Sequence, residues 1–191
     1  DDYMILSGPG FADDIKAMKS AKLTITDWRI KELFDTNYFS FDYTDDENGV
    51  LMCGALKNVM AIASGISDGC NLGDNARAAL ITRGLAEMAR FAVMLGGKKE
   101  SVSGLSGVGD LMLTANSRQS RNYSCGYEIG QAGWAKPVLE RCTKTVEGVA
   151  TAESVLKRAK DLNVEMPICR VVEEIIYHDK PIKEAMTDLL N

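Results

Sequence analysis

A helix that is apolar on nearly every side constrains this chain more than any other feature. Residues 46–67 carry apolar side chains around the whole helical circumference: Val50, Leu51, Met52, Cys53, Ala55, Leu56, Val59, Met60, Ile62 and Ile66. Such a helix is stable when other elements cover it on all sides, so it indicates the buried helix of a packed domain. The acids at 45–47 suit its start, because carboxylates cap free N–H groups and meet the positive end of the helix dipole.

The pattern stays helical from there to the end of the chain. Residues 75–95 carry an apolar stripe and end at Gly96-Gly97, a frequent helix stop. Pro167 and Pro181 suit the first helical position of two later segments. The further predicted helices span residues 108–115, 122–131, 151–161, 168–178 and 182–190.

Residues 3–43 have a different character. Strand-like segments alternate with helix-like ones, which predicts β–α units of a layered α/β sheet. The strand-like segments are 3–7, 22–26 and 38–43, and the helix-like ones are 11–20 and 28–34. Three strands are too few for such a sheet, so we interpret residues 1–45 as the end of an α/β domain whose first part lies upstream. Residues 46–191 are then an all-helical domain, and the expected fold class is mainly α.

The composition argues against several classes of function. The formal net charge is −5, from 22 Lys+Arg and 27 Asp+Glu, and the longest basic block is Lys98-Lys99, so no nucleic-acid partner is expected. The longest apolar run is short and interrupted, so no membrane span is expected either. The five scattered cysteines form no C-x-x-C pair and favour reduced thiols in the cytoplasm.

The single histidine gives little support for catalysis or metal binding. His178 is predicted to lie near a helix end, where interaction with the helix dipole is its ordinary role. Without a second histidine, a Ser/His/Asp triad and a histidine metal cluster are not expected.

Lys57 is the first candidate for chemistry, because it sits midway along the most apolar helix. A buried charge is costly unless it is paired or faces a cleft, and desolvation lowers the pKa of a lysine toward acid–base values. The alternative is a lysine whose ammonium group reaches the helix edge. Asn58 beside it adds a second polar group.

Three other segments could take part in a site. The glycine-rich segment 104–111 leads into a helix on which Asp110 and Thr114 share a face, although Asp110 alone could be an ordinary first-turn acid. The loop 117–122 carries two arginines, whose planar fork suits phosphate or carboxylate. Gly8-Pro9-Gly10 follows a strand end, where ligands of open α/β sheets bind.

Six segments spread along nearly the whole chain form a pattern when they are taken together. They are residues 6–12 (LSGPGFA), 54–59 (GALKNV), 73–84 (GDNARAALITRG), 107–111 (GVGDL), 119–122 (QSRN) and 146–148 (VEG). In this order and at similar spacing, they resemble the NAD(P)-dependent glycerol-3-phosphate dehydrogenases of the bacterial type, and the resemblance lies in their joint register.

The resemblance implies a role for each matching residue. Lys57 would be the general acid/base for the C2 oxygen, with Asn58, Asp110 and Thr114 around the substrate hydroxyls and holding the lysine. Arg121 and Asn122 would grip the phosphate, with Ser120 in the same loop. The remaining matches are the substrate-side turn at Gly8 and Gly10, and the cofactor contacts Ala12, Arg121 and Glu147.

The family also implies NAD or NADP as cofactor, glycerol 3-phosphate and dihydroxyacetone phosphate as substrates, no metal, and a cytoplasmic homodimer. Two departures stand out. Gly10 stands where family members commonly carry Ser or Thr, and the glycine-rich nucleotide-binding half is absent from the sequence. We therefore expect these 191 residues alone to be inactive. Two alternatives stay open: a non-catalytic dimerisation or phosphate-binding module, and a related dehydrogenase of another hydroxy acid.

Overall fold

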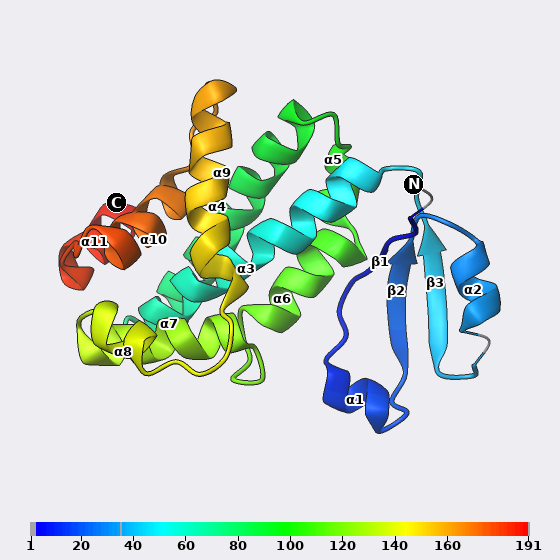
Figure 1. The fold of residues 1–191 in the computed structure, drawn as a ribbon, viewed down its shortest axis with the longest axis horizontal. Helices are drawn as coiled ribbons and strands as arrows, with labels where there is room; N and C mark the ends of the chain where they lie inside the picture. The colour runs from blue at the N-terminus through cyan, green and yellow to red at the C-terminus, as the bar shows by residue number, and fades with distance from the viewer. Residues whose placement is uncertain (1–2, 35, 191) are drawn as a thin grey trace.

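The structure is a computed structural model that describes residues 3–34 and 36–190. A small sheet with two short helices lies at one side of a much larger helical part (Figure 1). The N-terminal elements are β1 (Leu6–Ser7), α1 (Ala12–Lys16), β2 (Ala21–Ile25), α2 (Arg29–Leu33) and β3 (Phe39–Tyr43). The expected fold class, mainly α with a short α/β part, is confirmed.

The sheet has the order β1-β2-β3. β2 and β3 run parallel, with Ala21 opposite Phe39, and α2 connects them as a β-α-β unit. β1 instead runs antiparallel to β2, with Leu6 opposite Ile25. The alternation predicted from the sequence is therefore present, but it forms one parallel β-α-β unit preceded by a two-residue antiparallel strand.

From residue 47 onward the regular elements are helical. They are α3 (Glu47–Gly69), α4 (Gly73–Met94), α5 (Lys99–Ser103), a π-helical turn η1 (Leu105–Gly109), α6 (Asp110–Thr114), α7 (Arg121–Ala132), α8 (Lys136–Glu140), α9 (Glu147–Asp161), α10 (Pro167–Tyr177) and α11 (Ile182–Leu190). The predicted long helices are confirmed, whereas α5, η1 and α8 were not predicted. Pro167 opens α10 as predicted, but Pro181 lies just before α11.

α3 is the central helix of this part. It contacts α4, α7, α9 and α10, and 13 of its residues are buried. Among the described residues, α3 is the one helix whose length and composition would allow it to cross a membrane. However, 67% of its most apolar 18-residue stretch is buried inside the fold. That burial identifies it as a core helix, which agrees with its all-round apolar sequence.

α3 and α7 cross with their backbones in contact. A Cβ on Gly126 would lie 2.1 Å from the carbonyl oxygen of Ile62, and one on Gly130 would lie 2.4 Å from that of Ile66. Both pairs are 64 positions apart, so the two helices run parallel in a fixed register. The same offset, one turn earlier, places Asn122 beside Asn58, and a hydrogen bond joins them.

Candidate functional site

Lys57 and Asp110 form an ion pair between α3 and the start of α6. The Lys57 ammonium donates a hydrogen bond to Oδ2 of Asp110, and the side chains are 22% and 4% exposed. Burial raises the pKa of the Asp110 carboxyl, while the charge and hydrogen bond of Lys57 and the hydroxyl of Thr114 oppose that rise. Lys57 is therefore paired, and its ammonium group does not simply extend into bulk water.

The π-helical turn η1 directly precedes Asp110, which is the first residue of α6. Gly107 lies so close to the preceding segment that a Cβ there would be 1.9 Å from the carbonyl oxygen of Val102. Thr114, one helical turn after Asp110, donates a hydrogen bond of 3.2 Å to its Oδ1, which confirms that the two share a face. A Cβ on Gly109 would lie 3.5 Å from the ring of Pro9, so the Gly8-Pro9-Gly10 turn packs beside this segment.

A second group of polar side chains surrounds Asn122 on the first turn of α7. Its Nδ2 donates to Oδ1 of Asn58 at 3.0 Å and to Oε2 of Glu147 at 3.4 Å. Its Oδ1 accepts a hydrogen bond of 2.9 Å from the backbone N–H of Gly148. Arg121 donates to the other carboxylate oxygen of Glu147, and this pair is half-exposed. Three helices, α3, α7 and α9, thus meet at one amide.

The two groups are connected through α3, on which Lys57 and Asn58 are consecutive residues. Together they present a cation next to a buried carboxylate, and an arginine and an amide next to a second carboxylate. A held ammonium group can exchange a proton with an oxygen and stabilise negative charge on it. An arginine with an adjacent amide can bind a phosphate or a carboxylate.

The other predicted site residues have more local contacts. Ser120 is buried and caps α7, accepting a hydrogen bond from the N–H of Tyr123 at 3.2 Å. Gly8 has a φ of +130°, a conformation that L side chains rarely adopt. Ala12 begins α1 and is exposed, and within residues 3–34 and 36–190 no hydrogen bond or ion pair joins it to the Lys57 or Asn122 groups. Asn58 bonds to Asn122, and its described hydrogen bonds do not include Lys57.

Two features of other predicted residues are ordinary. The guanidinium of Arg118 stacks over the ring of Tyr127, with its Cζ 3.3 Å from the ring centroid. His178 caps the C-terminal end of α10, the position predicted for it, and its Nε2 lies 3.1 Å from Oε1 of Glu173.

Sequence reasoning missed the fully buried Glu87. Its two carboxylate oxygens accept hydrogen bonds from the backbone N–H groups of Ile168 and Cys169, at 2.9 and 3.0 Å, at the start of α10. The signal was available, since Glu87 lies next to Met88 on the apolar stripe of residues 75–95. The contacts of Glu87 hold two helices together, so we assign it a structural role.

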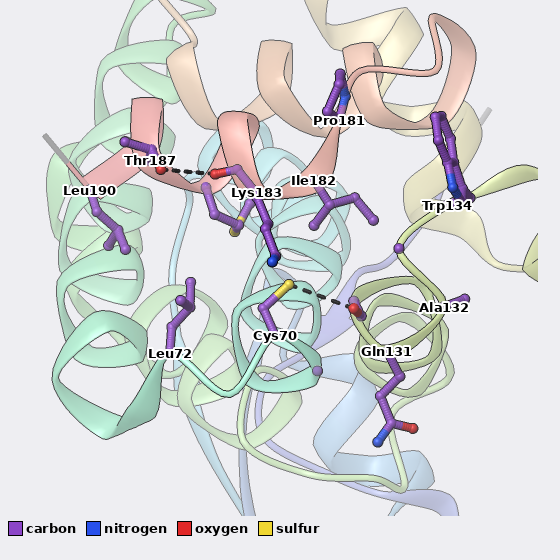
Figure 2. A pocket seen from close by; sticks show the side chains of 14 residues that line it. Cys70, Leu72, Gln131, Ala132, Trp134, Pro181, Ile182, Lys183, Thr187 and Leu190 are labelled. Carbon is purple, nitrogen blue, oxygen red and sulfur yellow. Dashed lines mark hydrogen bonds between the residues drawn. The ribbon is translucent and has the colours of Figure 1, made fainter.

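A cavity of about 740 Å³ lies at the far end of α3, between α7 and α11. Figure 2 shows Cys70 at the end of α3, Trp134 at the rim and the ammonium group of Lys183 near the thiol of Cys70. At 1.5 Å per residue, Cys70 is about 20 Å along the helix from Lys57. The cavity lining includes none of the predicted site residues.

Comparison with known proteins identifies relatives over the whole length of the chain. Residues 46–187 match the family model described as the NAD-dependent glycerol-3-phosphate dehydrogenase C-terminus. The chain is 41% identical to the glycerol-3-phosphate dehydrogenase [NAD(P)+] of Carboxydothermus hydrogenoformans, over 100% of the chain and 58% of the relative. It is 44% identical to that of a Geobacter species, over 97% of the chain and 57% of the relative.

A solved structure gives the same result for the fold. The crystal structure of glycerol-3-phosphate dehydrogenase from Coxiella burnetii matches with a TM-score of 0.92 and 37% identity, covering 98% of this chain and 60% of that one. The chain thus spans a little under three fifths of the curated relatives named above.

Proposed function

The chain belongs to the family of NAD-dependent glycerol-3-phosphate dehydrogenases, and we propose on that premise that it supplies the substrate-binding and acid–base residues of such an enzyme. In this proposal residues 46–191 form the substrate domain and residues 1–45 the end of the nucleotide-binding domain. The reaction is the interconversion of sn-glycerol 3-phosphate and dihydroxyacetone phosphate. The observation that carries the proposal is the ion pair of Lys57 with the buried Asp110, together with the hydrogen bond that joins Asn122 to Asn58, the residue after Lys57.

Lys57 is the general acid/base. When the ketone is reduced, negative charge develops on the C2 oxygen, and the Lys57 ammonium group gives it a proton. When the alcohol is oxidised, the same nitrogen takes the proton back. Asp110 fixes the position of the ammonium group, and Thr114 in turn holds Asp110.

Arg121 and Asn122 bind the phosphate end of the substrate. The guanidinium supplies charge and paired N–H donors, and the amide supplies a further donor at the start of α7. Ser120 contributes by capping α7 and fixing this loop. The Gly8-Pro9-Gly10 turn packs beside Gly109 and lies on the substrate side. Gly10 lacks the side-chain hydroxyl that Ser or Thr commonly supplies at this position in the family.

The residues present fit the edge of a nicotinamide site. Arg121 and Glu147 are half-exposed, so both are accessible to a bound cofactor. When bound, NAD or NADP supplies or accepts the hydride, and we propose Arg121, Glu147 and Ala12 as the residues of this chain that contact it. The expectation of a cytoplasmic homodimer stays a prediction.

The experiment measures oxidation of NADH or NADPH with dihydroxyacetone phosphate, by the gene product that carries this sequence. We expect Lys57→Ala to lower kcat by about 10²- to 10⁴-fold, while glycerol 3-phosphate still binds. Unchanged turnover in a folded variant would rule out Lys57 as the acid/base and favour a non-catalytic phosphate-binding module. A substrate panel separates the proposal from a dehydrogenase of another hydroxy acid.

The 191 residues alone are expected to be inactive. The chain spans about 58% of the Carboxydothermus relative, and the glycine-rich nucleotide turn lies outside its sequence. Ready oxidation of NADH by the isolated 191-residue protein would contradict this part of the proposal.

A further inference from the structure

One carboxylate, that of Glu147, takes up a donor from each of the two side chains assigned to phosphate. Its Oε1 accepts from Nη2 of Arg121, and its Oε2 accepts from Nδ2 of Asn122. This is the arrangement that two oxygens of a bound anion would have between an arginine and an amide. The carboxylate of Glu147 thus occupies donors of both side chains that the proposed function assigns to phosphate.

The amide of Asn122 is fully used in this arrangement. One Nδ2 hydrogen bond goes to Asn58 and the other to Glu147, while Oδ1 accepts from the backbone N–H of Gly148. An amide nitrogen has two hydrogens to donate. Asn122 therefore has no N–H left for a ligand until the Glu147 carboxylate moves away.

The contact between Glu147 and Arg121 is suited to exchange. Their side chains are 43% and 50% exposed, so water and solutes reach both. Exposed ion pairs are weak because water competes with each partner. Glu147 is the first residue of α9 and is not among the buried residues of that helix.

We propose that Glu147 is a specificity-determining residue that occupies the phosphate site in the absence of ligand and is displaced by a phosphate dianion. This inference rests on the proposed function, because it takes Arg121 and Asn122 as the phosphate-binding pair. A dianion with three acceptor oxygens outcompetes one carboxylate for these donors. A monoanionic carboxylate ligand only replaces one carboxylate by another, so the site selects phosphorylated compounds over simple carboxylic acids.

The test titrates the 191-residue protein and its Glu147→Gln variant with inorganic phosphate, where phosphate is mainly the dianion, at constant ionic strength. NMR signals of the Asn122 side-chain amide and the Arg121 guanidinium report binding. Removing a competing, half-exposed carboxylate is expected to tighten phosphate binding about threefold to tenfold. Acetate is expected to bind the variant measurably and the unmodified protein much more weakly.

Glu128→Gln is the matched control. Glu128 is also a half-exposed glutamate paired with an arginine, Arg141 at 3.0 Å, but it makes no hydrogen bond with Arg121 or Asn122. Its substitution is expected to leave phosphate affinity unchanged. Glu147→Ala, with circular dichroism as a folding check, is expected to change affinity in the same direction as Glu147→Gln.

The possible results separate the inference from the proposed function. Equal or weaker phosphate binding by Glu147→Gln, with binding still lost in Arg121→Ala, overturns the role of Glu147 and leaves the phosphate site in place. Binding that Arg121→Ala does not weaken, or no binding by either protein, overturns the phosphate site and the inference with it. Tighter binding in both Glu147→Gln and Glu128→Gln shows a general charge effect and also overturns the inference.

Discussion

The ammonium group of Lys57 and the carboxylate of Asp110 meet across 53 positions of the chain, joining the middle of α3 to the start of α6. Asp110 is the more deeply buried partner. Burial therefore dominates and raises the pKa of its carboxyl, while Lys57 is the main influence that opposes the rise. The charge state of Asp110 thus depends on a single neighbouring cation.

Replacing Lys57 by methionine removes that cation and keeps most of the side-chain volume. We expect the pKa of Asp110 to rise further, measured by ¹³C NMR of the Asp110 carboxyl during a pH titration. The free energy of unfolding at neutral pH should fall by about 1–3 kcal/mol, because a buried charged acceptor loses its strongest donor.

The sign of the pH dependence follows from the raised pKa. In the folded state Asp110 keeps its proton at pH values where the unfolded chain has released it. Its contribution to stability is therefore fully present below pH 3.8 and is lost as the pH rises through the folded pKa. In Lys57→Met this window extends to higher pH. Lys98→Met, which removes an exposed lysine paired with Asp45, serves as the control. An Asp110 titration curve identical in both variants would contradict the pairing.

Asp46 should show the opposite pH dependence. Burial disfavours its charge, but hydrogen bonds from Ser101 and from the backbone N–H groups of Gly49 and Lys98 outweigh burial and lower its pKa. Its contribution to stability is therefore present above 3.8 and is lost as the pH falls through the folded pKa.

Asp46→Ala removes the N-cap of α3, and chemical denaturation at neutral pH should show a loss of about 2 kcal/mol. Asp45→Ala is the natural comparison, because Asp45 is exposed and bonds to the Lys98 ammonium group. If both variants lost the same stability, the cap would not be the cause.

Glu87 offers a third test. Burial raises the pKa of its carboxyl, although the N–H groups of Ile168 and Cys169 oppose the rise. Protonation of Glu87 thus favours the folded state. Its contribution to stability is fully present below pH 4.5 and is lost as the pH rises through the folded pKa. We expect denaturation midpoints of Glu87→Gln to depend less on pH across that window than those of the unmodified protein.

Removing the whole carboxyl group of Glu87 should lower the stability of the fold more than Glu87→Gln does. Glu87→Ala leaves two buried N–H groups at the start of α10 without an acceptor, a loss of about 1–3 kcal/mol for each group left unpaired. Glu153→Ala, an exposed substitution on α9, should change stability little. A mild effect of Glu87→Ala would show that water replaces the carboxylate there.

Local patterns in the sequence were enough to predict some of these features. The all-round apolar pattern of residues 46–67 predicts the buried α3, since burial of a single helix depends on its own side chains. The acids before it predict the cap, which Asp46 provides. The spacing of Asp110 and Thr114 predicts their shared face, because residues four apart adjoin on any α-helix.

Features that depend on tertiary contacts could not be read in this way. The pairing of Lys57 with Asp110 is set by where α6 packs on α3, and neither segment alone specifies it. The two-residue strand β1 pairs with β2 in the antiparallel direction, and the residue pattern of either strand alone does not specify the direction of pairing.

The glycines between α3 and α7 give the last prediction, since their contacts also set the register of Asn58 and Asn122. A Cβ on Gly126 would lie 2.1 Å from the carbonyl oxygen of Ile62, so Gly126→Ala must push the helices apart, with an expected loss of about 1–3 kcal/mol. The hydrogen bond between Asn58 and Asn122, one turn away, should weaken, seen as a shift of the Asn122 side-chain amide signal.

Gly54→Ala is the matched control on α3: nothing lies within 4 Å of its Cβ position, and alanine should stabilise the helix by up to about 1 kcal/mol. Equal effects of the two substitutions would mean that helix propensity, not the close crossing, governs this interface.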